Sequence, residues 1–297
     1  MARTFIHETA SSYYPPRARW YSPLFYWGGA LRRRLALDRI NLPRALTPGG
    51  LVAGFLIPGL GIHLRSPKLW GRAAMPACGF LFFCFLVWFG FPAGNIAFGL
   101  LLAVHTIGFV YYCNPLFEQE LVRSRLWFTL LSLVGLGLLI YLPARNLILQ
   151  HWLVPLRLDG HVMVVQRQFP TAAIQRGDWV AYRLHGNEAW GENAMYVRSG
   201  LGLGPALALA GDRVEFSTNA FTVNGAPHPL RPHMPISGGM TVPEKNWFVW
   251  PDVGISGHGN VGEDRISSAM LQMAVVSENQ YIGKPFKRWF WRRQIIP

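Results

Sequence analysis

The chain has 297 residues, of which 51% are hydrophobic and only 14% are charged, with 28 Lys and Arg against 15 Asp and Glu. Soluble domains carry about 25% charged residues, so this composition excludes an ordinary soluble protein and indicates a chain that keeps much of its surface in lipid. The high content of aliphatic and aromatic residues also excludes a disordered chain, and three cysteines are too few for a disulfide-stapled miniprotein.

Residues 1–45 form a basic segment that we expect on the cytoplasmic side. They hold eight Arg against only Glu8 and Asp38, and Lys and Arg are retained on the cytoplasmic face of membranes. The aromatic stretch Trp20–Trp27, followed by Arg32-Arg33-Arg34, predicts an interfacial helix. The N-terminus lacks an apolar stretch followed by a small-residue cleavage site, so we expect no cleavable signal peptide.

Residues 46–149 are predicted to form a membrane domain. Three stretches are apolar and close to the 20 residues that a helix needs to cross a bilayer, at about 73–91, 93–113 and 126–148. The stretch 46–64 is also uncharged, but Pro58-Gly59-Leu60-Gly61 breaks its helical continuity. A crossing there would place the N-terminal arginines outside, so we interpret 46–64 as a re-entrant or interfacial segment and keep a fourth span as the alternative.

The basic loops indicate the orientation of these spans. Two loops carry five cations, which are Arg65, Lys68, Arg72, Arg123 and Arg125. Three spans place both loops and the N-terminus inside and everything after residue 149 outside. We therefore expect a multi-pass protein of the cell (inner) membrane that has the lipid bilayer as a partner and carries an extracytoplasmic C-terminal domain.

Residues 150–297 are predicted to form an all-β domain, a sandwich or partly closed barrel, because short β-rich runs alternate with Gly, Pro and Asn. The predicted strands are His161–Gln166, Asp178–Leu184, Ala194–Arg198, Arg213–Ser217, Ala220–Val223 and Trp247–Trp250. Asn224-Gly225 is a strong signal for a hairpin. The expected fold class is thus an α-helical membrane domain followed by an all-β extracytoplasmic domain.

The last stretch, 284–293, mixes aromatic and cationic residues in the way that is typical of a membrane headgroup interface. A nucleic-acid patch would have the same composition. A domain outside the membrane rarely meets nucleic acid, so we expect no nucleic-acid partner.

Few residues suggest a metal or cofactor, and we expect neither. The three cysteines, Cys78, Cys84 and Cys113, lie in or beside an uncharged block and are interpreted as small buried apolar residues. The six histidines of the C-terminal domain show no close metal-ligand spacing. His105 lies within a predicted span, where an ionisable group suggests a functional site, and a neutral imidazole bonded to a neighbouring helix is the alternative.

Five stretches of the C-terminal domain, in the same order along the chain, resemble motifs of the type I signal peptidases, the S26 serine peptidases. Leu-Ala-Leu-Ala-Gly-Asp-Arg-Val at 207–214 is similar to the family's Val-Gly-Leu-Pro-Gly-Asp-x-Val, and Phe-Thr-Val-Asn-Gly at 221–225 to its Leu-Thr-Ile-Asn-Gly hairpin. Tyr-Ile-Gly-Lys at 281–284 matches its closing strand. The others are the Gly-Asp strand pair within 159–183 and the Val-Pro stretch within 241–250.

The catalytic dyad of that family is missing from this chain. The family cuts with a serine just after the membrane span, activated by a lysine placed before the Gly-Asp element. No Ser occurs between Ser132 and Ser199, and no Lys between Lys68 and Lys245. The expected nucleophile region, 151–158, and base region, 202–206, hold neither residue. We therefore predict no catalytic residues and a divergent member that is a pseudoenzyme.

The resemblance implies a groove for an extended peptide, so we expect an outer-face protein or peptide partner, bound or scaffolded without cleavage. The alternative is an active S26-type serine endopeptidase with a relocated nucleophile, for which the candidates are Ser199, Ser256, Ser267 and Ser268. A triad of Ser256 with His258 and either Asp252 or Asp264 has the right residue types, but glycine-rich loops also collect such residues. A transporter or channel subunit is a third, weaker interpretation, since the spans hold few ionisable groups.

Overall fold

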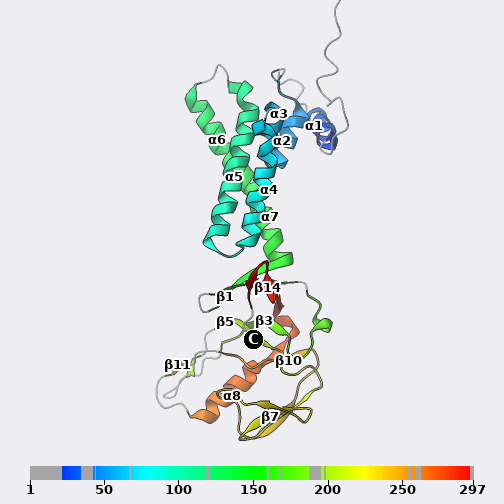
Figure 1. Cartoon of the computed structure of the whole chain (residues 1–297), viewed down its shortest axis with the longest axis vertical. Helices are drawn as coiled ribbons and strands as arrows, with labels where there is room; N and C mark the ends of the chain where they lie inside the picture. The colour runs from blue at the N-terminus through cyan, green and yellow to red at the C-terminus, as the bar shows by residue number, and fades with distance from the viewer. Residues whose placement is uncertain are drawn as a thin grey trace, which may run out of the picture. The chain divides into compact units, whose positions relative to one another are not determined.

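The computed structural model describes residues 22–34, 43, 45–66, 69–117, 121–158, 161–167, 169–186, 195–196, 199–252, 256–257 and 262–294. The chain divides into two compact units, a helical unit Met1–Leu147 and a β-rich unit Ile148–Pro297 (Figure 1). The change in composition along the sequence predicts this boundary between residues 149 and 150.

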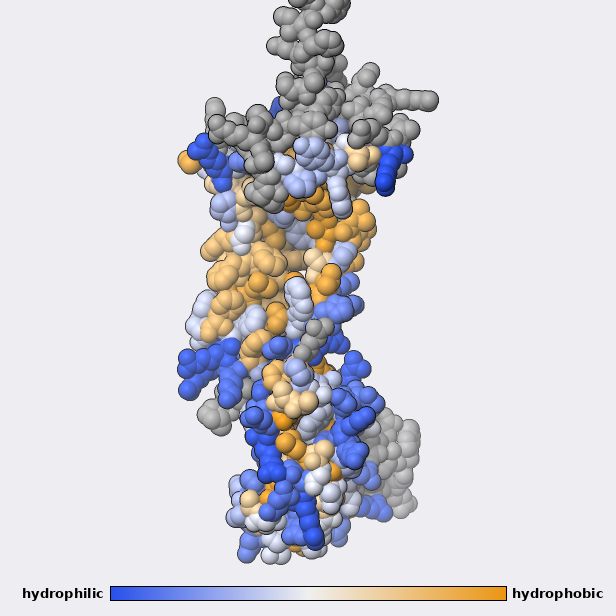
Figure 2. Space-filling model, turned by 90° about the vertical axis from the view of Figure 1, so that its right-hand side faces the viewer, coloured by the Kyte–Doolittle hydropathy of each residue, from blue (hydrophilic) through white to orange (hydrophobic). Residues whose placement is uncertain are grey.

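The helical unit contains α1 (Ser22–Arg34), α2 (Pro48–Leu56), α3 (Leu60–Arg65), α4 (Leu69–Val87), α5 (Pro92–Cys113), η2 (Asn114–Phe117), α6 (Val122–Leu136), η3 (Gly137–Tyr141) and α7 (Leu142–Leu147). Three continuous helices, Leu69–Val87, Pro92–Phe117 and Val122–Trp152, are long and apolar enough to cross a membrane. Large side chains such as Phe80, Ile96 and Leu131 are exposed on them, and Figure 2 shows hydrophobic residues gathered over the middle of the visible face of this unit. So wide an apolar surface is typical of a protein in lipid.

The stretch 46–64 forms two short helices, α2 and α3. Thr47 caps α2 by accepting a hydrogen bond from the Gly50 N–H at 3.1 Å. The chain then turns through Gly59, whose φ of 79° lies in the left-handed region that favours glycine. Nine and six residues are too short for either helix to span a bilayer alone. The break falls at the Pro58-Gly59 position on which the re-entrant interpretation was based.

The β-rich unit has a five-stranded sheet in the order β1-β2-β13-β3-β5 and a four-stranded sheet in the order β8-β7-β6-β9. The first contains β1 (Leu153–Leu158), β2 (His161–Gln166), β13 (Tyr281–Pro285), β3 (Trp179–Leu184) and β5 (Gly200–Pro205). The second contains β8 (Ala226–Pro229), β7 (Ala220–Val223), β6 (Arg213–Phe216) and β9 (Gly238–Thr241). Short pairs join β10 (Asn246–Phe248) to β12 (Val275–Ser277), β4 (Met195–Tyr196) to β11 (Ser256–Gly257), and β14 (Arg288–Trp289) to β15 (Arg292–Arg293).

Each predicted strand coincides at least in part with an observed one. The Asn224-Gly225 hairpin is confirmed, because β7 pairs with β8 and both turn residues have positive φ, 51° and 82°. Alternation directs Val214 and Phe216 of β6 and Phe221 of β7 into the main core of the unit.

The prediction of an all-β domain was wrong, because the unit also contains the helix α8 (Glu263–Ala274). Its apolar residues follow a helical spacing, and four of them are buried against the core, which are Ala269, Met270, Met273 and Ala274. The unit is therefore β-rich rather than all-β. The short helix η4 (Ile148–Trp152) precedes β1 without any intervening residue.

Candidate functional site

Three of the stretches that carry the family resemblance converge on the carboxylate of Asp212, which is 7% exposed. Arg176 donates to it from Nε at 2.8 Å and from Nη2, and Asn224 donates from Nδ2 at 2.9 Å. The backbone N–H of Leu209 adds a further bond of 2.7 Å. We call Arg176, Asp212 and Asn224 the Asp212 cluster.

The Asp212 cluster is built to hold a charge rather than to move a proton. The bonded Arg176 guanidinium and the other donors lower the pKa of Asp212 to about 2, although burial acts in the opposite direction. A carboxylate with so low a pKa is a weak general base near neutral pH. The cluster ties the turns before β3 and β6 to the β7–β8 turn.

A second ion pair joins two further parts of the resembling motifs, the Gly-Asp turn before β3 and the Gly-Lys pair in β13. Lys284 Nζ lies 2.7 Å from Asp178 Oδ2 and 4.6 Å from the ring centre of Phe169. Burial acts to raise the pKa of Asp178, but Lys284, the Gln175 N–H and the charge of Lys287 hold it below its usual value. This lysine is thus paired with a carboxylate, and among the described residues no serine bonds to it.

The two regions expected to hold the dyad are strands at opposite edges of the five-stranded sheet. Residues 153–158 of the expected nucleophile region form β1, and residues 202–205 of the expected base region belong to β5. Neither strand carries a serine or a lysine.

The hydroxyls of three candidate serines bond backbone groups. Ser199 accepts a hydrogen bond from the Gly186 N–H at 2.9 Å, and Ser268 donates to the Asp264 carbonyl at 2.8 Å. Ser267 donates to the His233 carbonyl at 2.9 Å. The Ser256 side chain and His258 lie outside the described residues, so that triad stays a hypothesis.

One set of residues escaped the sequence analysis, namely His233 and Glu263 beside Ser267. His233 Nδ1 lies 3.1 Å from Glu263 Oε2, which is the way a carboxylate orients a catalytic imidazole. The Ser267 hydroxyl, however, donates to the backbone carbonyl of His233. The arrangement fastens the turn before β9 to α8, and the 30-residue separation of the pair left no local signal in the sequence.

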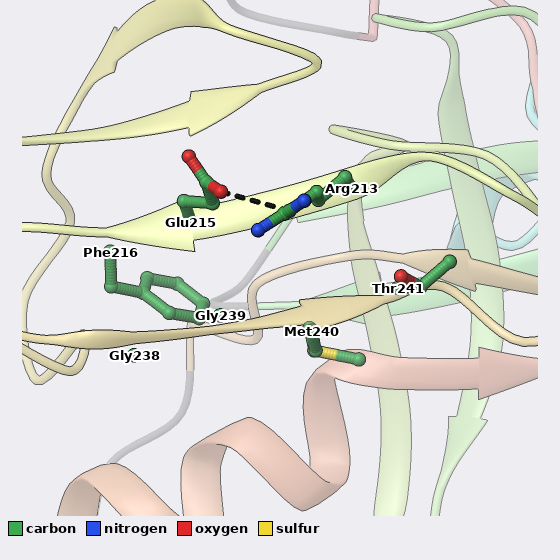
Figure 3. Close-up of a pocket in the computed structure, with 7 residues that line it drawn as sticks. All are labelled: Arg213, Glu215, Phe216, Gly238, Gly239, Met240 and Thr241. Atoms are coloured by element: carbon green, nitrogen blue, oxygen red, sulfur yellow. Dashed lines mark ion pairs between the residues drawn. The ribbon is translucent and has the colours of Figure 1, made fainter.

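A polar depression lies on β6 and β9, as Figure 3 shows. Its two charged side chains, Arg213 and Glu215, pair with each other at 2.8 Å. No serine, cysteine, histidine or lysine lines it. Thr241 supplies the one hydroxyl of its lining, with no histidine or lysine beside it to activate that group, and the two charges are paired with each other.

The buried His105 of α5 is bonded at both ring nitrogens. Nε2 lies 3.0 Å from the Gly54 carbonyl of α2, and Nδ1 lies 3.1 Å from the Tyr141 hydroxyl. A carbonyl only accepts, so Nε2 carries a proton and donates it to Gly54. The Tyr141 hydroxyl also donates to the Leu101 carbonyl, at 3.4 Å. This arrangement fits the alternative of a neutral imidazole that links neighbouring helices.

The feature with the most direct binding potential is β5, the last strand of the five-stranded sheet (Figure 1). Within the described part of the chain, β5 pairs only with β3. Gly202 lets the strand lie against Tyr182, since a Cβ there would be 2.4 Å from the ring. On the strand, Leu201 is 43% exposed.

One bond next to β5 shows which of its residues face β3. The Ala206 N–H donates to the Asp178 carbonyl at 2.8 Å. Because antiparallel ladder bonds alternate, Gly202 and Gly204 direct their backbone groups toward β3. The N–H and carbonyl groups of Leu201 and Leu203 then point away from β3, along the outer edge. Such an edge can accept an added strand.

Residues in the described ranges provide no group of three or more His, Cys, Asp and Glu side chains that could hold a metal ion. In the comparisons with known proteins, no family model and no curated protein matches the chain.

Proposed function

We propose that this chain is an integral protein of the cell (inner) membrane with a signal-peptidase-like β unit on the extracytoplasmic side. The β unit binds an extended segment of an exported or membrane-complex protein along β5 and does not cut it. The observation that carries this proposal is the outer edge of β5, where the backbone groups of Leu201 and Leu203 point away from β3.

The same edge suits a bound peptide better than a catalytic centre. Main-chain hydrogen bonds to an edge strand supply affinity, and exposed side chains such as Leu201 supply selectivity. The polar residues of the resembling motifs are engaged in the Asp212 cluster and in the Asp178–Lys284 pair. Peptide binding at β5 thus needs neither the Asp212 cluster nor the Asp178–Lys284 pair.

The test is peptide binding by the full chain in nanodiscs, using a fluorescent signal-sequence peptide that ends in Ala-x-Ala followed by polar residues. Leu201→Pro removes an outward N–H without removing a bond to β3, and proline is tolerated at sheet edges. We expect it to weaken binding about tenfold, which corresponds to the loss of about one hydrogen bond. Leu201→Ala keeps the N–H and is expected to stay within about threefold.

Equal affinity of the proline and alanine variants, or no binding by the wild type, would contradict docking at β5. The same samples are followed for peptide cleavage by mass spectrometry. Cleavage that is lost in Ser267→Ala or in another serine variant would instead establish the active peptidase with a relocated nucleophile.

A further inference from the structure

We propose that the β14–β15 hairpin, residues 286–293, docks on the surface of a bilayer that contains anionic lipids. Its two-residue loop, Phe290-Trp291, inserts into the headgroup layer while the cations beside it meet lipid phosphates. This contact is independent of peptide binding at β5.

The tip of the hairpin exposes two aromatic side chains to solvent. Trp291 is 66% and Phe290 is 44% exposed, and their ring centres lie 6.1 Å apart. Trp289 and Phe286 continue the aromatic row behind them, with ring centres 5.2 Å apart. Tryptophan and its aromatic neighbours favour the membrane–water interface, where the ring is half in the apolar layer.

The loop conformation indicates that Phe290 and Trp291 do not favour the turn itself, so we interpret them as residues that contact the membrane. Two-residue hairpin loops favour Asn and Gly because positive φ is needed. Here Phe290 adopts φ of 54°, which is an outlier for a bulky side chain. Strained positions of this kind persist where a function retains them.

The charge of the hairpin is complementary to an anionic surface. Residues 287–293 hold four cations, which are Lys287, Arg288, Arg292 and Arg293, and no Asp or Glu follows Glu278 in the sequence. Lys287, Arg288 and Arg293 are exposed. Each such cation strengthens attachment to an anionic membrane about fivefold.

Hydrogen bonds to β2 hold both ends of the hairpin in place. Phe286 donates its N–H to the Val164 carbonyl at 3.1 Å, and the Gln294 side chain accepts from the Val164 N–H at 3.1 Å. Both ends are therefore bonded to the buried strand β2. In the sequence, β1 begins directly after the third candidate span, so the chain tethers this unit to any bilayer that the helix crosses.

The experiment uses the full chain, with its three cysteines changed to alanine, in nanodiscs of phosphatidylcholine alone or with about one third phosphatidylglycerol. A fluorophore is attached through Trp291→Cys, or through Thr218→Cys in the exposed β6–β7 turn as the matched control. Lipids that carry a spin label near the headgroup quench a probe that reaches the membrane. We expect at least twofold stronger quenching at 291 than at 218 in the anionic discs.

The charge variant Arg288→Gln with Arg293→Gln is expected to reduce the quenching at 291 to the level in phosphatidylcholine. Because the probe replaces an aromatic residue, hydrogen exchange of the 286–294 amides is also measured in the chain that keeps Trp291. We expect protection in anionic discs that the charge variant loses. Quenching at 291 no stronger than at 218, or equal quenching and exchange in both lipids, would overturn the proposal.

Discussion

The carboxylate of Asp212 shows how a charged residue can serve structure alone. It accepts hydrogen bonds from Arg176, Asn224 and the Leu209 backbone. We expect Asp212→Asn to destabilise the β-rich unit by about 1 to 3 kcal/mol, because an amide nitrogen then faces these donors. The matched control is Glu215→Gln, which removes an exposed ion pair with Arg213 and is expected to cost less than about 0.5 kcal/mol.

The low pKa of Asp212 predicts that the stability of the β-rich unit depends on pH in the acid range. This pKa is about 2 in the folded chain against 3.8 ordinarily, so the folded state binds fewer protons between these values. The stabilisation is complete above about pH 4 and is lost as the pH falls toward 2. Thermal unfolding followed by near-ultraviolet circular dichroism should show the gap between wild type and Asp212→Asn closing over this range, whereas a constant gap would contradict the assignment.

At the scale of the elements, the contact between α3 and α5 depends on the absence of a side chain at Gly61. A Cβ on this residue would lie 2.5 Å from the Gly108 carbonyl oxygen. We expect Gly61→Ala to cost about 1 to 3 kcal/mol in detergent unfolding, since α3 must move away from α5. Gly99→Ala on α5 is the control, because its Cβ meets nothing within 4 Å. Equal losses at the two positions would argue against a close helix contact.

The elements also show what local patterns can predict. Long apolar runs predict the candidate spans, and Asn224-Gly225 predicts its hairpin, because each signal lies within one segment. The helical spacing of α8 was readable in Ala269, Met270 and Met273 but was missed among turn residues. β5 escaped prediction because glycine disfavours strands, and it is a strand through its pairing with β3.

The candidate site was less predictable than the fold, because it is assembled from distant segments. Arg176 and Asp212 are 36 residues apart, and Lys284 and Asp178 are farther apart still. The motifs identified these residues one by one, but no spacing rule indicates that they bond. The position of β5 at the edge of the described sheet is likewise a property of the order of strands and not of its own sequence.

At the scale of the whole molecule, three spans and the basic loops predict opposite sides for two positions. A cysteine at Leu121, next to the loop before α6, should lie inside, and one at Thr218 in the β-rich unit should lie outside. In chains that lack the native cysteines, an impermeant maleimide should label Thr218→Cys in intact cells. It should label Leu121→Cys only after permeabilisation, and the reverse pattern would refute the orientation.

The strand order of the five-stranded sheet has a mechanical consequence. β1 follows the third candidate span along the chain, whereas β5 forms the opposite edge, so a segment bound at β5 pulls on the sheet across its hydrogen-bond ladders. The ladders from β13 to β2 and from β13 to β3 have two registered pairs each, against six between β3 and β5. Tension across the sheet would therefore part it first at β13, whose β2 side is reinforced by the bonds from Val164 to Phe286 and Gln294.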